Sequence, residues 1–326
     1  MTRLVLVTGA SGFIGRALVG LLASAGWQVR AATRSLQQGT ADTRINWVQL
    51  GDLARPVDWR PMLDGVSHVV HLAGLAHADP ATDDGSYRAI NAEATRALAL
   101  AARNADVRRL LFVSSTRAQS GPIAERVLTE DDPPAPTDAY GRSKLLAERF
   151  VAETLAESAT EWVVLRPAVV FGPGVRGNMH QLLRLALSSI PLGIGGLSGR
   201  RSIVSVANLS SAVAHALTAP ACAGGTYLVA DAEPVTVPAI VATLRIAAGR
   251  APKIFPLPQG PLRAVLGAFG LGPELDRMSG DLVVDTGRLV ATGWQPREST
   301  RDGLAAWMRS AKTNPVWLRD RRAHGA

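Results

Sequence analysis

The fold of this chain is decided near its beginning by the stretch Leu4-Val5-Leu6-Val7-Thr8-Gly9-Ala10-Ser11-Gly12-Phe13-Ile14-Gly15, a short apolar run followed by three glycines spaced GxxGxxG. Gly9 lets the chain turn sharply off a strand end, and Gly12 removes a side chain where a pyrophosphate would approach the backbone. Gly15 lets the following helix, predicted over 13–25, pack closely on the strand. The N-terminus of that helix would present free N–H groups to a phosphate. A strand, glycine turn and helix in this order predict a dinucleotide-binding site.

The composition is typical of an ordinary globular protein. Of the 326 residues, 47% are apolar and 19% are charged, and the formal net charge is +8. Most of that charge comes from arginines scattered along the chain, and no nucleic-acid-binding motif accompanies them. The positive balance therefore indicates either an anionic small molecule or only an arginine-rich composition, and we expect no nucleic-acid partner.

Cysteine usage and hydropathy predict a soluble, cytoplasmic protein. Cys222 is the only cysteine, so an intrachain disulfide is impossible, as is typical of a reducing compartment. The apolar run 4–7 is too short for a signal-peptide core. The apolar stretch 257–275 is interrupted by Arg263, glycines and prolines, so we expect no membrane insertion.

Strand-like and helix-like segments alternate along the first half of the chain. Predicted strands lie at 28–33, 47–50, 67–72, 110–114 and 162–165, and the longer predicted helices lie at 87–103 and 140–158. This alternation is typical of an α/β fold of the Rossmann type, a doubly wound parallel sheet covered on both faces. Ligands then bind at the carboxyl ends of the strands.

After Pro167 glycine and proline become frequent, and the stretch 171–199 breaks into short pieces. We therefore predict an NAD(P)-binding Rossmann domain over 1–168 and a smaller, mixed substrate-binding part over 169–326. The range 200–220, with a strand over 202–206, is expected to return to the first domain.

A second motif, Tyr140-Gly141-Arg142-Ser143-Lys144, falls on a predicted helix. Tyr140 and Lys144 are four residues apart, so both side chains emerge on one face. An ammonium beside a phenol favours the phenolate and would lower the pKa of Tyr140 toward that of a general acid or base. The alternative is an ordinary surface pair on an amphipathic helix.

Three hydroxyls, Ser114-Ser115-Thr116, end a predicted buried strand, where an open sheet places its active site. One of them could donate a hydrogen bond to a substrate oxygen beside Tyr140. The alternative is that they only cap the following turn.

In order and spacing, these motifs resemble the extended short-chain dehydrogenase/reductases, and more narrowly their nucleotide-sugar epimerase, dehydratase and 4-reductase branch. The resemblance covers essentially the whole chain. The residues that carry it are Thr8 to Gly15, His71-Leu72-Ala73-Gly74, Ser114-Ser115-Thr116, Tyr140 to Lys144, Leu165-Arg166-Pro167, Val170-Phe171-Gly172-Pro173-Gly174, Arg201 to Val206, Asp285 and Gly293-Trp294-Gln295-Pro296.

The resemblance implies a catalytic role for Thr116, Tyr140 and Lys144. Tyr140 would exchange a proton with the sugar, and Lys144 would hold the nicotinamide ribose. Thr116 is the family's hydroxyl because it lies five residues before Gly121, although Ser120 stands where the family usually has a tyrosine. The implied cofactor contacts are Gly9, Ser11, Gly12, Phe13, Ile14, Gly15, Arg34, Asp52, Leu53, Leu72, Ala73, Gly74, Ser114, Tyr140, Lys144 and Pro167.

The end of the second predicted strand indicates which dinucleotide is bound. A carboxylate there normally accepts the ribose 2′-hydroxyl of NAD, but this chain has Thr33-Arg34-Ser35. Arg34 could pair with a 2′-phosphate, so NADP(H) is favoured and NAD(H) remains possible. The alternative is that Arg34 is only a solvated surface arginine.

For the substrate, the resemblance implies contacts from Ser115, Thr116, Asn178, Arg201 and Arg277, with Asn178 and Arg201 on a nucleoside diphosphate. A loop asparagine and surface arginines are the alternative. His71 and His77 have no accompanying ligand cluster, so no metal is expected.

We expect hydride transfer at C4 of a nucleotide-linked sugar, most simply by a 4-keto-sugar reductase. The alternatives are a 4-epimerase with tightly bound NAD and a reductase of a small hydrophobic ketone or aldehyde. A dehydratase is disfavoured because Arg117-Ala118 stand where that branch has an Asp-Glu pair. A cofactor sensor without catalytic activity would not need Tyr140 and Lys144. The resemblance also suggests a homodimer.

Overall fold

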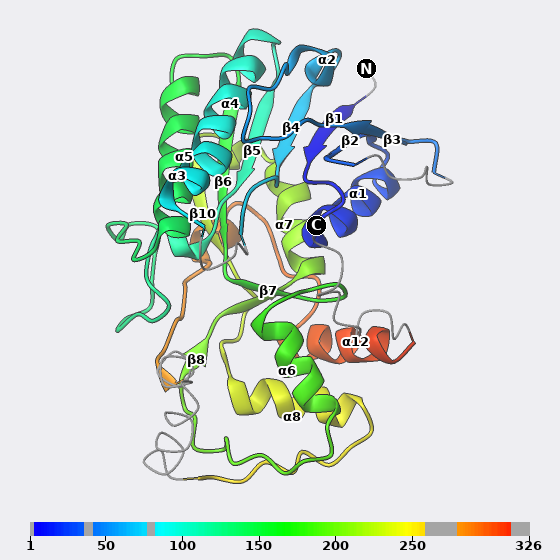
Figure 1. The fold of residues 1–326 in the computed structure, drawn as a ribbon, viewed down its shortest axis with the longest axis vertical. Helices are drawn as coiled ribbons and strands as arrows, with labels where there is room; N and C mark the ends of the chain where they lie inside the picture. Colours follow the sequence, from blue (N-terminus) through cyan, green and yellow to red (C-terminus); the bar gives the residue numbers. More distant parts are fainter. Residues whose placement is uncertain (1–2, 36–41, 77–81, 258–278, 314–326) are drawn as a thin grey trace.

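The computed structural model describes residues 3–35, 42–76, 82–257 and 279–313, and its centre is a seven-stranded sheet (Figure 1). All the strand pairs are parallel, and the strand order is β10-β6-β5-β4-β1-β2-β3. The strands are β1 (Leu4–Thr8), β2 (Gln28–Thr33), β3 (Ile45–Gln49), β4 (His68–His71), β5 (Arg109–Val113), β6 (Glu161–Pro167) and β10 (Gly225–Val229). The order reverses between β1 and β4, so the carboxyl ends of these two strands form the switch point at which such a sheet binds its ligand. The predicted Rossmann fold is confirmed.

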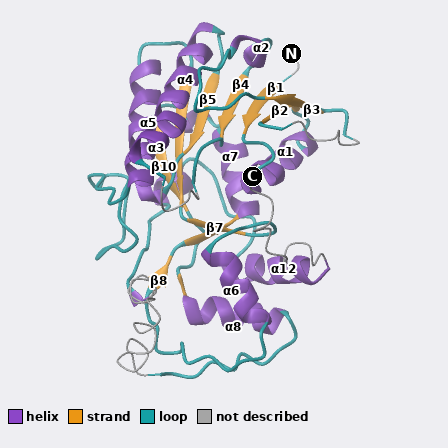
Figure 2. Ribbon diagram, in the orientation of Figure 1, coloured by secondary structure: helices purple, strands orange, loops and turns teal. Residues whose placement is uncertain are grey.

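Helices cover both faces of this sheet (Figure 2). Alternate residues of β1 point to opposite faces, so Val5 and Val7 join one apolar core while Leu6 joins the other. The first core packs against α1 (Phe13–Ser24) and α7 (Val206–Ala216). The second packs against α2 (Arg60–Leu63), α4 (Ala94–Asn104) and α5 (Ala139–Leu155).

Two short helical segments lie in the connections that follow β4 and β5. The π-helix η1 (Arg88–Glu93) runs from α3 (Asp84–Tyr87) directly into α4, and the 3-10 helix η2 (Thr116–Ala118) follows β5. A single π-turn within a helix is rare and is frequently found at functional sites.

The smaller part of the molecule lies below the sheet in Figure 1. It holds the strand pairs β7 (Val169–Phe171) with β9 (Ile203–Ser205) and β8 (Arg200–Arg201) with β11 (Val235–Thr236). Helices α6 (Asn178–Leu187), α8 (Val237–Ala247) and α12 (Thr300–Thr313) enclose its core around Phe171 and Trp307. The remaining described helices are η3 (Pro220–Cys222) and α11 (Gly287–Ala291).

The predicted return of 200–220 to the main sheet is only half right. The strand expected over 202–206 does not join that sheet, because β9 pairs with β7. Helix α7 from the same range does lie against α1, and β10 beyond it adds the seventh strand beside β6. Within the described ranges, no helix combines the length and apolarity needed to cross a membrane.

Candidate active site

Two of the three glycines of the first turn, Gly9 and Gly15, occupy positions where a side chain would collide with backbone. Gly9 has φ +69°, and a Cβ there would lie 2.9 Å from the backbone nitrogen of Ala73. A Cβ on Gly15 would lie 2.2 Å from the carbonyl oxygen of Gly9. Helix α1 begins after Gly12 without a side-chain cap and without an acidic residue in its first turn. Its first N–H groups and its dipole therefore suit an anion such as a pyrophosphate.

A second observation also fits a dinucleotide at this edge. Ser114 follows β5 and is only 4% exposed, yet its Oγ is buried with no hydrogen-bond partner among the described residues. A buried hydroxyl without a partner is unfavourable, so it marks a place where a ligand group can bind. Leu72, Ala73 and Gly74 follow β4 at the same edge, and Pro167 ends β6.

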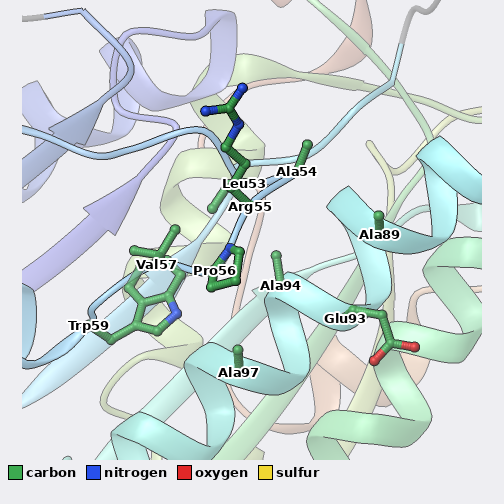
Figure 3. Close-up of a pocket in the computed structure, with 10 residues that line it drawn as sticks. All are labelled: Leu53, Ala54, Arg55, Pro56, Val57, Trp59, Ala89, Glu93, Ala94 and Ala97. Atoms are coloured by element: carbon green, nitrogen blue, oxygen red, sulfur yellow. The ribbon is translucent and has the colours of Figure 1, made fainter.

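Three of the predicted cofactor contacts, Arg34, Asp52 and Leu53, lie in the segments that follow β2 and β3. Arg34 is exposed, and the Asp52 carboxylate accepts a hydrogen bond from the backbone N–H of Ala54. Leu53 lines a cavity of about 310 Å³ between the 53–59 segment and the helical wall formed by η1 and the N-terminal part of α4 (Figure 3). Trp59 also lines it, and the ring nitrogen of Trp59 is buried with no hydrogen-bond partner in the described part of the chain. None of the three predicted catalytic residues lines this cavity.

A chain of buried hydrogen bonds holds the segment after β4. His71 contacts the Thr8 hydroxyl through Nδ1 at 2.7 Å and the Thr95 hydroxyl through Nε2 at 3.0 Å. Since the Thr95 hydroxyl donates to the carbonyl of Asn91, it must accept from His71 Nε2–H, which assigns the tautomer. The Thr8 hydroxyl in turn accepts from the N–H of Ala73. Burial lowers the pKa of His71 to about 3, so this ring is neutral and structural.

Asn91, which the sequence reasoning did not select, links that segment to the predicted catalytic helix. The amide of Asn91 pairs with both backbone groups of Leu75 at 2.7 and 3.0 Å. Its Nδ2 also donates to the Ser143 hydroxyl, which donates to the carbonyl of Tyr140. A Cβ on Gly74 would lie 2.8 Å from Asn91 Oδ1, so a side chain there would push Asn91 away from its hydrogen bonds. Asn91 lies in the π-helix η1, which no pattern of apolar residues predicts.

Tyr140 lies in the first turn of α5, beside the hydroxyls that follow β5. Burial raises the pKa of Tyr140 to about 12, while a hydrogen bond with the Ser115 side chain and the charge of Arg117 lower it. The ring also meets Tyr87 edge-to-face, with centroids 6.2 Å apart. Ser115 is therefore the hydroxyl that contacts Tyr140. Thr116, 3% exposed, begins η2, and its catalytic role stays a prediction.

Lys144 lies one turn further along α5 and is 4% exposed. Its Nζ donates to the carbonyl of Val113 at 2.9 Å and lies 4.4 Å from the centre of the Phe112 ring. Burial lowers the pKa of Lys144 to about 8. The expectation that Lys144 lowers the pKa of Tyr140 is wrong for this arrangement, because burial dominates at Tyr140 and the ammonium faces Phe112 and Val113.

A buried ion pair braces α5 against β6 behind the site. Arg166 donates from Nε to Glu148 Oε1 at 3.0 Å, and both side chains are 6% exposed. A further Arg166 nitrogen donates to Gln119 Oε1 at 2.6 Å, which ties the segment after η2 to the same pair. This pair gives Arg166 of the Leu165-Arg166-Pro167 motif a structural role.

The predicted substrate residues are spread over the smaller part. Arg201 in β8 donates to the carbonyls of Pro122 at 3.1 Å and Gly280 at 3.3 Å, so it joins three segments of the chain. Asn178 is exposed at the start of α6. Arg277, like His77, lies outside the described residues. Among the residues that the structure describes, no three His, Cys, Asp or Glu side chains gather as metal ligands.

Comparison with known proteins agrees with this geometry. The model of the NAD dependent epimerase/dehydratase family matches residues 5–230. The chain belongs to this family. It is 32% identical over 314 residues to a protein of Vibrio cholerae named UDP-glucose 4-epimerase, covering 93% of this chain and 94% of that one.

Two solved structures extend the likeness to nearly the whole chain. The structure of MoeE5 in complex with UDP-glucose and NAD has a TM-score of 0.73 and 26% identity, covering 95% of this chain and 99% of that one. A short-chain dehydrogenase/reductase superfamily protein from Agrobacterium tumefaciens with bound NAD has a TM-score of 0.72 and 25% identity, covering 97% of this chain and 100% of that one. The chain is thus an enzyme of an NAD-dependent family, with a fold shared by proteins that bind NAD and, in one case, a nucleotide sugar.

Proposed function

We propose that this protein is a 4-epimerase of a nucleotide-linked hexose. The observation that carries the proposal is the meeting of Ser115 and Tyr140 at the carboxyl edge of the sheet, beside a glycine cradle that fits a dinucleotide. The chain is similar over nearly its full length to a protein named UDP-glucose 4-epimerase. This similarity favours epimerisation over the 4-keto-sugar reduction expected from the sequence.

In this proposal the chain moves a proton at the C4 oxygen of the sugar. A bound nicotinamide supplies the acceptor and donor of hydride. Tyr140 Oη takes the proton of the C4 hydroxyl on oxidation and returns it on reduction, while Ser115 donates a hydrogen bond to the same oxygen. Since the pKa of Tyr140 is about 12, the bound complex must lower it, and Arg117 is a cation whose charge already acts in that direction.

The experiment is to incubate the purified protein with UDP-hexoses, adding no nicotinamide cofactor, and to follow C4 configuration by proton NMR. We expect inversion at C4 to equilibrium with no net change in absorbance at 340 nm. Stoichiometric oxidation of added NADPH with a 4-keto sugar, and no inversion, would instead establish the reductase.

That reductase is the second candidate, and Arg34 favours it. No carboxylate stands at the end of β2 to accept a ribose 2′-hydroxyl, and the exposed Arg34 guanidinium suits a 2′-phosphate. Titration with NADH and NADPH separates the two candidates, with Arg34→Glu as the matched variant. NADPH binding that is tighter than NADH binding and is lost in Arg34→Glu supports the reductase, whereas NADH binding that is equal or tighter supports the epimerase.

Substitution of Arg201 tests whether the protein binds its substrate through a nucleoside diphosphate. Arg201→Ala should raise KM for a nucleotide sugar by about tenfold or more, because a charge-assisted contact to phosphate is lost. The neighbouring Arg200, exposed and paired with Asp281, provides the control Arg200→Ala. Equal kinetics in both variants would favour a small hydrophobic ketone or aldehyde as substrate. A homodimer and a cytoplasmic location stay predictions.

A further inference from the structure

Arg117 follows the hydroxyl segment directly and forms an ion pair with Asp138, whose exposed fraction is 43% against 24% for Arg117. Asp138 is the N-cap of α5 and lies two residues before Tyr140. The pair therefore joins the segment that carries Ser115 to the helix that carries the predicted acid/base.

Three attachments meet at Arg117. Its backbone N–H donates to Ser115 Oγ at 3.1 Å, which leaves the Ser115 hydroxyl hydrogen free to point elsewhere. Its carbonyl oxygen lies against Gly141, where a Cβ would approach it to 2.2 Å. Its guanidinium holds Asp138, and the other carboxylate oxygen of Asp138 accepts from the N–H of Gly141 at 2.7 Å.

We propose that the Arg117–Asp138 pair is a positioning device that sets both the separation and the charge balance between Ser115 and Tyr140. Arg117 and Asp138 are positioning residues here, because they act through Ser115 and Tyr140 and need not touch substrate. The inference rests on the proposed role of Tyr140 as acid/base.

The charges around Tyr140 make the device testable. The groups that face it are Ser115 and Arg117 from the η2 segment, Tyr87 from α3 and Asp138 from its own cap. Asp138 and Tyr87 raise the pKa of Tyr140, and Arg117 lowers it. Lys144 follows on the same helix and faces Phe112. While Arg117 and Asp138 are both present, their effects on the phenol oppose each other, and removing one leaves the other uncompensated.

The test uses Arg117→Met, Asp138→Asn, their combination and Arg117→Lys, each in the full chain. Asparagine still caps a helix and methionine keeps the aliphatic stem, so all four are expected to fold. The readout is the phenolate absorbance of Tyr140 during a pH titration, taken as the difference from the same protein with Tyr140→Phe. A parallel readout is the acidic limb of the pH profile of kcat, because the oxidation step needs the phenolate of Tyr140.

Arg117→Met should raise the apparent pKa of Tyr140 by about half a unit to one unit, and Asp138→Asn should lower it by about as much. The double variant should return close to the wild-type pKa. Arg117→Lys should keep that pKa, because the charge remains, but should lower kcat several-fold because the fork geometry is lost.

Unchanged Tyr140 titration in both single variants, with only a lower melting temperature, would overturn the inference and leave the pair a structural brace. A pKa in Arg117→Lys equal to that in Arg117→Met would also contradict it. The titration needs no turnover, so it tests this inference separately from the proposed function. Failure of the proposed function would instead appear as full activity of Tyr140→Phe.

Discussion

The carbonyl oxygen of Arg117 lies 2.2 Å from the position that a Cβ on Gly141 would occupy. Helix α5 therefore sits directly on the segment after β5, and this contact fixes where Tyr140 stands relative to Ser115. Alanine is the better helix former, so helix propensity alone would make Gly141→Ala stabilising by about 1 kcal/mol.

Gly141→Ala should instead displace the first turn of α5 and lower kcat by about 10- to 100-fold, with less effect on KM. Steady-state kinetics with a nucleotide sugar measures this, and circular dichroism shows whether the variant folds. Wild-type kcat in a folded variant would mean that the spacing of η2 and α5 does not control the chemistry.

Gly15 and Gly20 lie in the same helix but differ in their surroundings. A Cβ on Gly15 would meet the backbone of Gly9 and Ala10 at 2.2 and 2.7 Å, whereas a Cβ on Gly20 would have nothing within 4 Å. Gly15→Ala should weaken NADH binding at least about tenfold because the phosphate turn must move. Gly20→Ala should bind NADH normally and be slightly more stable. Calorimetric titration compares the NADH affinities of the two variants. Equal affinities would contradict the role of the glycine turn in binding the dinucleotide.

Thr8 and Ser114 both carry buried hydroxyls, but we expect the hydroxyl of Thr8 to be structural and that of Ser114 to bind the ligand. Thr8 contacts His71 Nδ1 at 2.7 Å and accepts from the Ala73 N–H at 3.2 Å, so Thr8→Val leaves buried groups unpaired and should lower the free energy of unfolding by about 1–3 kcal/mol. Ser114 Oγ has no partner among the described residues, so Ser114→Ala should not lower that free energy but should weaken dinucleotide binding. Denaturant unfolding measures the free energy of unfolding, and NADH titration measures the affinity for the dinucleotide. Equal stability losses in the two variants would contradict this distinction.

Much of the fold was predictable because the strands are buried on both faces. The alternation of strand-like and helix-like segments predicts β2 at its observed bounds, and helical periodicity predicts α1 to within a residue. The strand at Ile203–Ser205 was misassigned because a strand of three residues does not specify its partner. β10, which pairs with β6 across some 60 residues of chain, was not predicted at all.

The sequence predicted which residues belong to the candidate site, but not which of them contact one another. Motifs identified Tyr140 and Lys144, but the ion pair of Arg117 with Asp138 joins segments 21 residues apart and has no local signal. Asn91 depends on a π-turn, which no periodicity predicts. The pKa of Tyr140 depends on how deeply α5 packs, and burial there outweighs the cations that the spacing suggested.

Asp231 should make the free energy of unfolding fall as pH rises, which is the opposite of what most carboxyl groups do. It is 3% exposed and accepts from Asn208 Nδ2 at 2.8 Å, and burial raises its pKa to about 6. The folded state therefore keeps a proton that the unfolded state loses above about pH 4, so this group's contribution to stability is present at low pH and is lost as pH rises to 6. The size is about 2–3 kcal/mol.

Asp231→Asn should remove this component, so its unfolding free energy relative to wild type should rise between pH 4 and 6. Taking the difference cancels His68 and His71, whose lowered pKa values act in the opposite direction in both proteins. Denaturant unfolding at several pH values measures it. A difference that does not vary with pH would show that Asp231 is ionised throughout.

The central claim is that Tyr140 moves the proton at the sugar C4 oxygen. The most direct measurement is kcat for C4 inversion by Tyr140→Phe, beside Tyr87→Phe, which alters the ring in edge-to-face contact with it. We predict that Tyr140→Phe loses about 10²- to 10⁴-fold in kcat while still binding NADH, and that Tyr87→Phe stays within a few-fold of wild type. Inversion by Tyr140→Phe at the wild-type rate would contradict the account.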